Sequence, residues 1–165
     1  MAIVNNVTRL LDSHRISYKA YETPPEKLGA LETANILGID AALVYKTIVV
    51  VRDKPKKPVL VVIPGTKIVD LKLVAIAFGD KKVTLPTERE AELITGLRAG
   101  GISPLALINK GFSVVVDVSA QEISEIHISG GQRGLNLKLK VKDLLELTKA
   151  RYADVSRLQI SDQNT

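Results

Sequence analysis

The chain of 165 residues falls within the usual size of a single domain, and 45% of its residues are hydrophobic, enough for a sizeable aliphatic core. It contains no cysteine, which excludes a disulfide framework, a thiolate metal site and a cysteine nucleophile. With 23 basic and 18 acidic residues the formal net charge is +5, a mild bias that favours an anionic partner.

We expect residues 1–155 to form one domain and the polar residues 156–165 to form a flexible tail, with disorder over 161–165. The N-terminus shows no signal-peptide pattern, and no apolar run approaches the length of a membrane span. The sequence therefore predicts a cytoplasmic protein without a membrane partner.

The first 40 residues predict two helices joined by an extended segment. A short amphipathic helix is expected over 7–11, and the extended segment after it stops at Pro24-Pro25. The second helix is expected over 26–37, because Gly38 is a typical C-terminal stop.

Two apolar runs, 41–51 and 59–63, flank a turn over 53–58 that contains three lysines and two prolines. This pattern predicts a β-hairpin with a long basic turn.

The remainder of the chain alternates helices with short strands. Helices are expected over 71–78, 88–95 and 141–149, and Thr87 with Glu90 forms a capping box before the middle one. Strands are expected over 83–85, 113–118, 122–128 and 135–139.

Lys46 is the only charged residue in the run 41–51. A continuous β-branched strand is usually covered on both faces, where an unpaired ammonium is costly. Lys46 therefore either reaches solvent or a carboxylate for structural reasons, or takes part in chemistry. The strand pattern alone leaves both interpretations open.

Two glycine-rich segments can bring backbone amides close to a ligand, because glycine has no side chain in the way. They are Gly100-Gly101-Ile102-Ser103-Pro104 and Ser129-Gly130-Gly131-Gln132-Arg133-Gly134. Their spacing matches neither a dinucleotide fingerprint nor a Walker loop, and a plain turn is the structural alternative for each. Strand alternation predicts Ile126 and Ile128 on one face, with His127 and Ser129 on the other.

A catalytic triad of Ser129, His127 and Asp117 is conceivable, but Ser129 and His127 are near neighbours on one strand face and cannot readily form a buried relay. The chain has two isolated histidines and no cluster of metal-ligating residues at suitable spacing. We expect neither a metal nor another cofactor.

Three motifs, taken in order, resemble the YbaK and prolyl-tRNA-synthetase-associated editing domains, which hydrolyse mischarged aminoacyl-tRNA. The first motif is Val44-Tyr45-Lys46-Thr47, and the second is Thr95-Gly96 leading into the loop from Gly100 to Leu105. The third motif runs from Ile128 through the glycines to Leu135. The resemblance extends from Tyr21 through the last predicted helix.

This resemblance implies an α+β fold in which a mixed, largely antiparallel sheet forms a partial barrel flanked by helices. It implies a freestanding trans-editing deacylase, and the Gly-Gly-Ile-Ser-Pro loop is most similar to the bacterial branch that acts on Cys-tRNA(Pro). Two alternatives remain: a deacylase for another small ester such as Ala-tRNA(Pro), and a non-catalytic module that binds tRNA or a synthetase. The implied partners are mischarged tRNA and prolyl-tRNA synthetase, not DNA.

The resemblance also implies roles for individual residues. Lys46 matches the essential lysine of the family, and the implied mechanism uses the substrate thiol or a positioned water as nucleophile. The implied substrate-binding residues are Tyr21, Thr47, Gly100, Gly101, Ile102, Ser103, Pro104, Ser129, Gly130 and Gly131.

Overall fold

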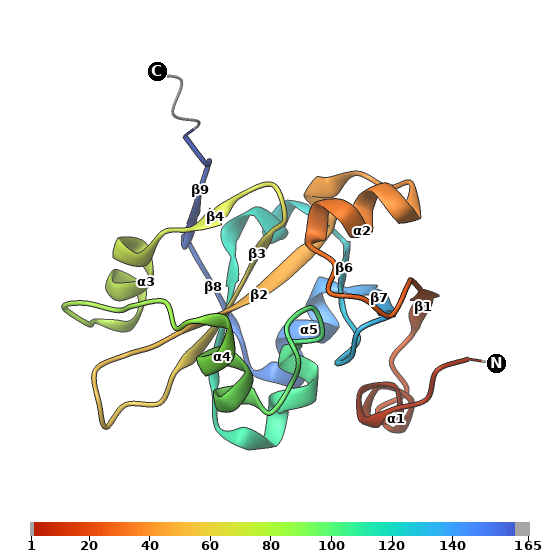
Figure 1. The fold of residues 1–165 in the computed structure, drawn as a ribbon, viewed down its shortest axis with the longest axis horizontal. Helices are drawn as coiled ribbons and strands as arrows, with labels where there is room; N and C mark the ends of the chain where they lie inside the picture. Colours follow the sequence, from red (N-terminus) through yellow and green to blue (C-terminus); the bar gives the residue numbers. More distant parts are fainter. Residues whose placement is uncertain (1, 161–165) are drawn as a thin grey trace.

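Three sheets frame the fold in the computed structural model, which describes residues 2–160 (Figure 1). The first sheet has the order β1 (Tyr18–Glu22), β7 (Leu135–Lys140), β6 (Glu125–Ser129), and all its pairings are antiparallel. The second has the order β2 (Tyr45–Val50), β3 (Val59–Pro64), β5 (Ser113–Asp117), β8 (Arg151–Ala153). The third pairs β4 (Ile68–Val69) with β9 (Ser156–Arg157).

Helices surround these sheets (Figure 1). The α-helices are α1 (Asn6–Ser13), α2 (Ala30–Leu37), α3 (Leu71–Phe78), α4 (Glu88–Thr95) and α5 (Val141–Thr148). Short 3₁₀ helices cover η1 (Ala41–Leu43), η2 (Pro104–Lys110) and η3 (Val118–Glu122). Within residues 2–160, no helix has the length and apolar character needed to cross a membrane.

The second sheet is mixed, since β2 and β3 pair antiparallel whereas β3–β5 and β5–β8 pair parallel. A parallel bridge between Val44 and His127 connects the start of β2 to β6, so the first two sheets meet without closing a barrel. The predicted α+β class and the predicted hairpin are confirmed.

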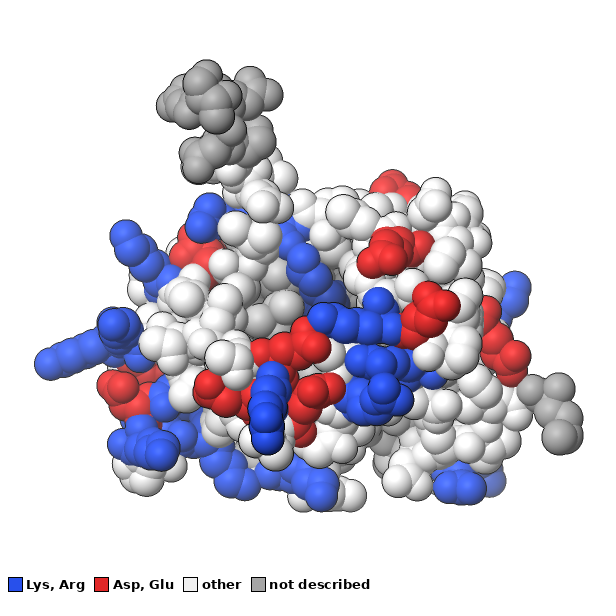
Figure 2. Space-filling view, viewed as in Figure 1, with Lys and Arg blue, Asp and Glu red and all other residues white. Residues whose placement is uncertain are grey.

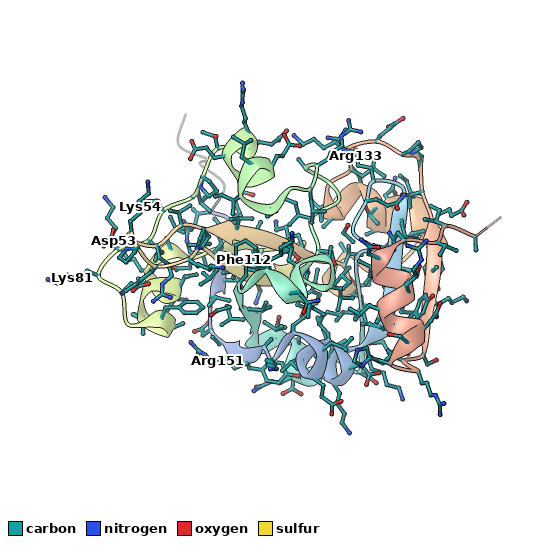
Figure 3. All side chains as sticks on the ribbon, turned by 90° about the horizontal axis from the view of Figure 1, so that it is seen from below. Asp53, Lys54, Lys81, Phe112, Arg133 and Arg151 are labelled. Atoms are coloured by element: carbon teal, nitrogen blue, oxygen red, sulfur yellow. The ribbon has the colours of Figure 1, made fainter. Side chains whose placement is uncertain are left out.

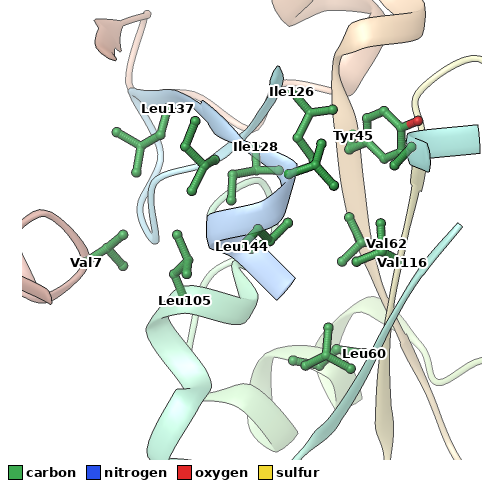
Figure 4. Packing of buried hydrophobic residues seen from close by; sticks show 14 of the residues in the cluster. Val7, Tyr45, Leu60, Val62, Leu105, Val116, Ile126, Ile128, Leu137 and Leu144 are labelled. Carbon is green, nitrogen blue, oxygen red and sulfur yellow. The ribbon is translucent and has the colours of Figure 1, made fainter. Parts of the chain in front are cut away.

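The core is aliphatic and lies on both faces of β3, whose residues are all buried. Leu60 and Val62 join the cluster that also contains Ile126 and Ile128 from β6 (Figure 4). The alternate residues Val59, Val61 and Ile63 join a second cluster beneath α3. Each fully buried side chain of this kind contributes roughly 1.5–3 kcal/mol, so this double-sided burial fixes the position and register of β2 and β3.

Several predicted boundaries were wrong. The helix predicted over 26–37 begins only at Ala30, because Gly29 has an extended conformation and serves as its N-cap. The predicted strand 83–85 is reduced to one bridge, between Thr84 and Val51. Residues 118–122 form a 3₁₀ helix, with Asp117 as its N-cap, so the strand predicted from residue 122 starts at Glu125.

The predicted tail also starts too early. Ser156 is buried, and its hydroxyl donates to Asp117 Oδ1 over 2.9 Å. Ser156 and Arg157 pair with β4, so sheet pairing continues two residues past the predicted domain end. Residues 161–165, for which disorder was expected, lie outside the described part of the chain.

Asp80, which follows α3, anchors the β2–β3 hairpin. Its carboxylate, only 2% exposed, accepts from Arg52 Nε at 2.6 Å and from Lys56 Nζ at 2.6 Å. These hydrogen bonds, first from Arg52 and then from Lys56, lower the pKa of Asp80 from 3.8 to about 2. The ionised carboxylate therefore stabilises the folded state at neutral pH.

We predict that Asp80→Asn lowers the melting temperature at pH 7, because both cations lose their anionic partner. A group with a depressed pKa stabilises the fold above its unfolded pKa and loses that contribution as pH falls through the folded pKa. The difference between wild type and variant should thus shrink from about pH 4 down to about pH 2. Thermal unfolding followed by circular dichroism measures this difference. Asp53→Asn, an exposed control in the hairpin turn that Asp80 anchors, should change little, and a pH-independent difference for Asp80→Asn would contradict the assignment.

Candidate active site

A cavity of about 270 Å³ brings together three segments that are far apart in the sequence. The start of β2 contributes Lys46 and Thr47, the first glycine loop contributes Gly100 and Ile102, and the end of β6 contributes Ser129. The segment between β1 and α2 and the start of β7 complete the lining. A larger hollow of about 1350 Å³, between α1, α5 and the end of η2, contains none of the predicted site residues.

Lys46 is half-buried, whereas its neighbour Tyr45 is only 2% exposed and belongs to the core. Strand alternation directs these two side chains to opposite faces. The start of β2 contributes Tyr45, Lys46 and Thr47 to the cavity lining. Among residues 2–160 no carboxylate lies within salt-bridge distance of its ammonium. Burial lowers the pKa of Lys46 from 10.5. The ion-pair interpretation therefore finds no support, and the cavity presents a partly desolvated cation to whatever enters it.

Behind Ser129, a polar pair is buried in the first sheet. His127 Nδ1 and Asn136 Oδ1 are 2.8 Å apart, and Asn136 lines the cavity opposite Ser129. Because the amide oxygen can only accept, Nδ1 carries the proton. Burial lowers the pKa of His127 from 6.5, so the ring is neutral at neutral pH. The ring of Tyr21 lies 5.4 Å from that of His127, which places Tyr21 beside the site.

The first glycine loop divides into residues that line the cavity and residues that support them. Gly100 has φ +89°, and a Cβ there would lie 3.1 Å from the Cα of Lys27, so this position requires glycine. Gly101 lies against the backbone of Gln132, where a Cβ would be 2.8 Å from the nearest atom. Ser103 is fully buried and caps η2, and Pro104 is the first residue of η2. None of Gly101, Ser103 and Pro104 lines the cavity.

The second glycine segment closes the β6–β7 hairpin. The N–H of Gly130 donates to the carbonyl of Leu135 over 2.9 Å, and a Cβ on Gly130 would overlap the Leu135 side chain at 2.5 Å. The N–H of Gly131 donates to Ser129 Oγ over 3.3 Å. Gly130 and Gly131 thus shape the turn and hold the Ser129 hydroxyl, although they do not line the cavity.

Two side chains outside the predicted set clamp the first glycine loop at Ala99. Its N–H donates to Glu92 Oε2 over 2.8 Å, and its carbonyl accepts from Arg133 Nε over 2.7 Å. Glu92 and Arg133 were not predicted to support the site, and neither was Asn136. In the sequence, Arg133 belongs to the second glycine segment, Glu92 to a predicted helix and Asn136 to a predicted strand, and none of these positions reveals a contact across the fold.

The triad of Ser129, His127 and Asp117 does not form in the described structure. Asp117 interacts with Ser119, Val155 and Ser156, whereas His127 pairs with Asn136. Nor do three or more His, Asp or Glu side chains gather as potential metal ligands within residues 2–160.

The comparisons with known proteins agree with this architecture. The family model of the aminoacyl-tRNA editing domain matches residues 24–147. A protein of Enterococcus faecalis (strain ATCC 700802 / V583), named as a candidate Cys-tRNA(Pro)/Cys-tRNA(Cys) deacylase, EbsC, is 36% identical over 153 residues, covering 92% of each chain.

Two solved structures share the fold. The hypothetical protein APE2540 superposes with a TM-score of 0.84 at 26% identity, covering 93% of this chain and all of that one. A candidate trans-editing enzyme for prolyl-tRNA synthetase superposes with a TM-score of 0.78 at 24% identity, covering 94% of this chain and 99% of that one. The chain belongs to the aminoacyl-tRNA editing domain family. The predicted family and the predicted class of activity, aminoacyl-tRNA editing, are confirmed; the roles of the individual site residues remain predictions.

We predict that Gly101→Ala displaces the first glycine loop, because the new methyl meets the backbone of Gln132, which cannot yield as a flexible side chain could. Overpacking of this kind costs roughly 1–3 kcal/mol, and a loop shift of about 1 Å can cost about 100-fold in activity. The measurements are the melting temperature and the rate of aminoacyl-tRNA deacylation per folded molecule.

Gly79→Ala is the matched control, because Gly79 has φ +68°, a new Cβ there would meet nothing within 4 Å, and the residue does not line the cavity. It should lose a similar amount of stability through backbone strain alone while retaining its activity. Equal activity in the two variants would show that Gly101 has no influence on the site.

Proposed function

We propose that this protein is a freestanding trans-editing deacylase whose main substrate is Cys-tRNA(Pro), with Lys46 as the catalytic residue. The observation that carries the proposal is the ammonium of Lys46, which forms no ion pair within residues 2–160, in a cavity shared with Ser129 and the Gly100 loop. The volume of about 270 Å³ is below the range typical of drug-sized ligand pockets, which suits the aminoacyl end of a tRNA rather than its body. The 36% identity to EbsC supports the choice of cysteine.

Lys46 supplies the electrostatic part of the reaction. An ammonium in a partly dry cavity stabilises the negative charge that develops on the ester oxygens, or holds the terminal phosphate. Its burial strengthens both effects, because water no longer screens the charge.

The remaining lining residues orient the substrate. The Ser129 hydroxyl, which accepts a hydrogen bond from Gly131, still has its own proton to donate to the ribose or the amino acid. Thr47 also contributes to the lining, and Asn136, paired with the neutral His127, forms the wall beside Ser129. Tyr21 lies against His127, outside the lining. Gly100 and Ile102 confine the aminoacyl group from the opposite side.

The proposed nucleophile is the thiol of the substrate. Its sulfur attacks its own ester carbonyl, so that a C–S bond forms and the ester C–O bond breaks. The thiol proton ends on the ribose oxygen that leaves. The products are free tRNA and a cyclic thiolactone, which water opens afterwards. A thiol of pKa about 8.5 is a few per cent ionised at neutral pH and is intrinsically very nucleophilic, whereas an alanyl ester offers only a methyl.

Prolyl-tRNA synthetase is the proposed protein partner. The cavity is too small to contain the parts of tRNA that distinguish one tRNA from another, so a second protein that selects the tRNA for proline would supply that specificity. A cytoplasmic location follows from a role in tRNA editing and is part of the same proposal.

Lys46→Ala should lower deacylation of Cys-tRNA(Pro) by about 10²–10³-fold, the usual effect of removing one transition-state donor. The fold should be as stable as wild type or more so, because the variant removes a half-buried cation that has no ion pair among the described residues. Lys46→Arg should fail as well, since a planar guanidinium does not replace a compact ammonium. Single-turnover deacylation and thermal unfolding measure these effects. Lys142→Ala, an exposed control on α5, should behave as wild type, and a folded, fully active Lys46→Ala would refute the assignment.

A panel of Cys-, Ser- and Ala-tRNA(Pro) tests the nucleophile. Only the cysteinyl ester should react quickly, with a thiolactone as first product that mass spectrometry detects after trapping. Ser129→Ala should slow this reaction only partly, because Ser129 orients the substrate and does not react. Comparable rates for the alanyl and cysteinyl esters, with free amino acid as first product, would replace the thiol by water and assign the protein to alanyl editing. Tight binding of aminoacyl-tRNA without turnover would instead indicate a binding module.

A further inference from the structure

The positive charge of the chain is concentrated at one end of the molecule. We define the basic tip as residues 52–57, residues 80–82 and Lys110. It holds seven of the 23 basic residues and two of the 18 acidic residues, which leaves 16 of each sign in the rest of the sequence. The whole formal charge of +5 therefore resides in the basic tip. Elsewhere positive and negative side chains are interspersed, as on the face shown in Figure 2.

The basic tip is held together by its own contacts. Asp80 binds Arg52 and Lys56, which ties the hairpin turn to the end of α3. The ammonium of Lys57 donates to the carbonyl of Lys110 over 2.9 Å, which ties the turn to the end of η2. Because these contacts already hold the groups in place, a binding partner does not need to order them, and this part of the conformational entropy cost is avoided.

Three further lysines of the basic tip are exposed and form no ion pair within residues 2–160. They are Lys54, Lys81 and Lys82. Lys54 and Lys81 project from the same end of the molecule in Figure 3. The neighbouring aromatic ring of Phe78 is covered by the guanidinium groups of Arg52 and Arg151, 5.1 and 5.2 Å from its centre. The surface therefore suits phosphate groups rather than stacked bases.

The basic tip and the cavity lie at opposite ends of β2. Lys46 stands at the start of the strand, and Val50 at its end leads into the turn. At roughly 3.3 Å per residue these two positions are about 13 Å apart, and Lys54 lies beyond them. A partner that fills the cavity and also reaches the basic tip must therefore be larger than an aminoacyl nucleoside.

We infer that the basic tip binds the phosphate backbone of the tRNA whose aminoacyl end occupies the Lys46 cavity, an inference that rests on the proposed function. The tRNA body cannot enter the cavity and must pass over the protein surface. A polyanion is attracted to a surface with net positive charge, and the basic tip provides such a surface. Binding through phosphates carries little sequence information, which agrees with tRNA selection by a separate protein.

The test uses Lys54→Gln/Lys81→Gln/Lys82→Gln, which removes three charges and leaves the Asp80 network intact. The matched control is Arg9→Gln/Lys140→Gln/Lys142→Gln, three exposed cations on α1 and at the start of α5.

Binding of uncharged tRNA(Pro) is followed by fluorescence anisotropy as a function of salt. Each lost phosphate contact reduces the slope of log K against log salt by about 0.7–0.9. The magnitude of this slope should be smaller by about 2 in the tip variant than in wild type. When the salt is raised from about 50 to 200 mM, the factor by which binding weakens should therefore be roughly 20 times smaller for the variant than for wild type. The control should keep the wild-type slope.

A second readout separates the basic tip from the catalytic site. The tip variant should lose at least about tenfold in kcat/KM on Cys-tRNA(Pro) at low salt, through KM, as expected from the loss of phosphate contacts. It should cleave cysteinyl-adenosine, which carries no tRNA body, at the wild-type rate. If wild type cleaves neither ester, the proposed function fails, while the binding experiment still decides whether the basic tip contacts RNA.

Equal salt slopes for the tip variant and the control would overturn the inference. Unchanged binding and turnover with tRNA alone, combined with loss of stimulation by prolyl-tRNA synthetase, would also overturn it and would identify the basic tip as a surface for an acidic protein.

Discussion

The alternation of Tyr45 and Lys46 along β2 is the constraint on which the site depends. Tyr45 is held in the core, and its hydroxyl lies 2.8 Å from Ser119 Oγ. Because successive side chains of a strand point to opposite faces, this anchoring directs Lys46 into the cavity. A shift of one residue against β3 would place the ammonium in the core and the ring in the cavity. The buried side chains of β3, packed on both of its faces, prevent that shift.

Close backbone packing completes the site from the other side. Gly101 lies against the Gln132 backbone, and Arg133 reaches back to the Ala99 carbonyl, so the two glycine segments form one unit. Asn5 at the start of α1 adds bonds to the Gly130 carbonyl and the Gln132 side chain. A cavity wall built from such contacts is preorganised, so little reorganisation is needed when the substrate enters. The conformational freedom of the wall is thus restricted by residues such as Gly101, Gln132 and Arg133, which do not line the cavity themselves.

Patterns local in sequence predicted much of the fold. The β-hairpin, the helices that end at Gly38, Gly79 and Gly96, and the inward face of Ile126 and Ile128 follow from alternation, capping and glycine stops. β4, β8 and β9 were missed because two or three residues carry no readable period. For the site, Lys46 was identifiable as a charge in an apolar strand. Asn136 was not, because its contact with His127 depends on a hairpin register that no local pattern specifies.

The proposed thiol-dependent reaction would solve a problem of selectivity that the cavity alone leaves open. Alanine, serine and cysteine differ by a single atom or group, and a pocket distinguishes such side chains by only about 1–3 kcal/mol through binding. The cavity lining combines polar residues such as Lys46 and Ser129 with apolar ones such as Ile102, and a cavity that admits one side chain does not exclude a smaller one. If the substrate supplies its own nucleophile, discrimination moves from binding to reactivity, where thiol, hydroxyl and methyl differ far more. The protein would then need only to stabilise charge and hold the ester in place, which are the roles proposed for Lys46 and for the loop that contains Gly100.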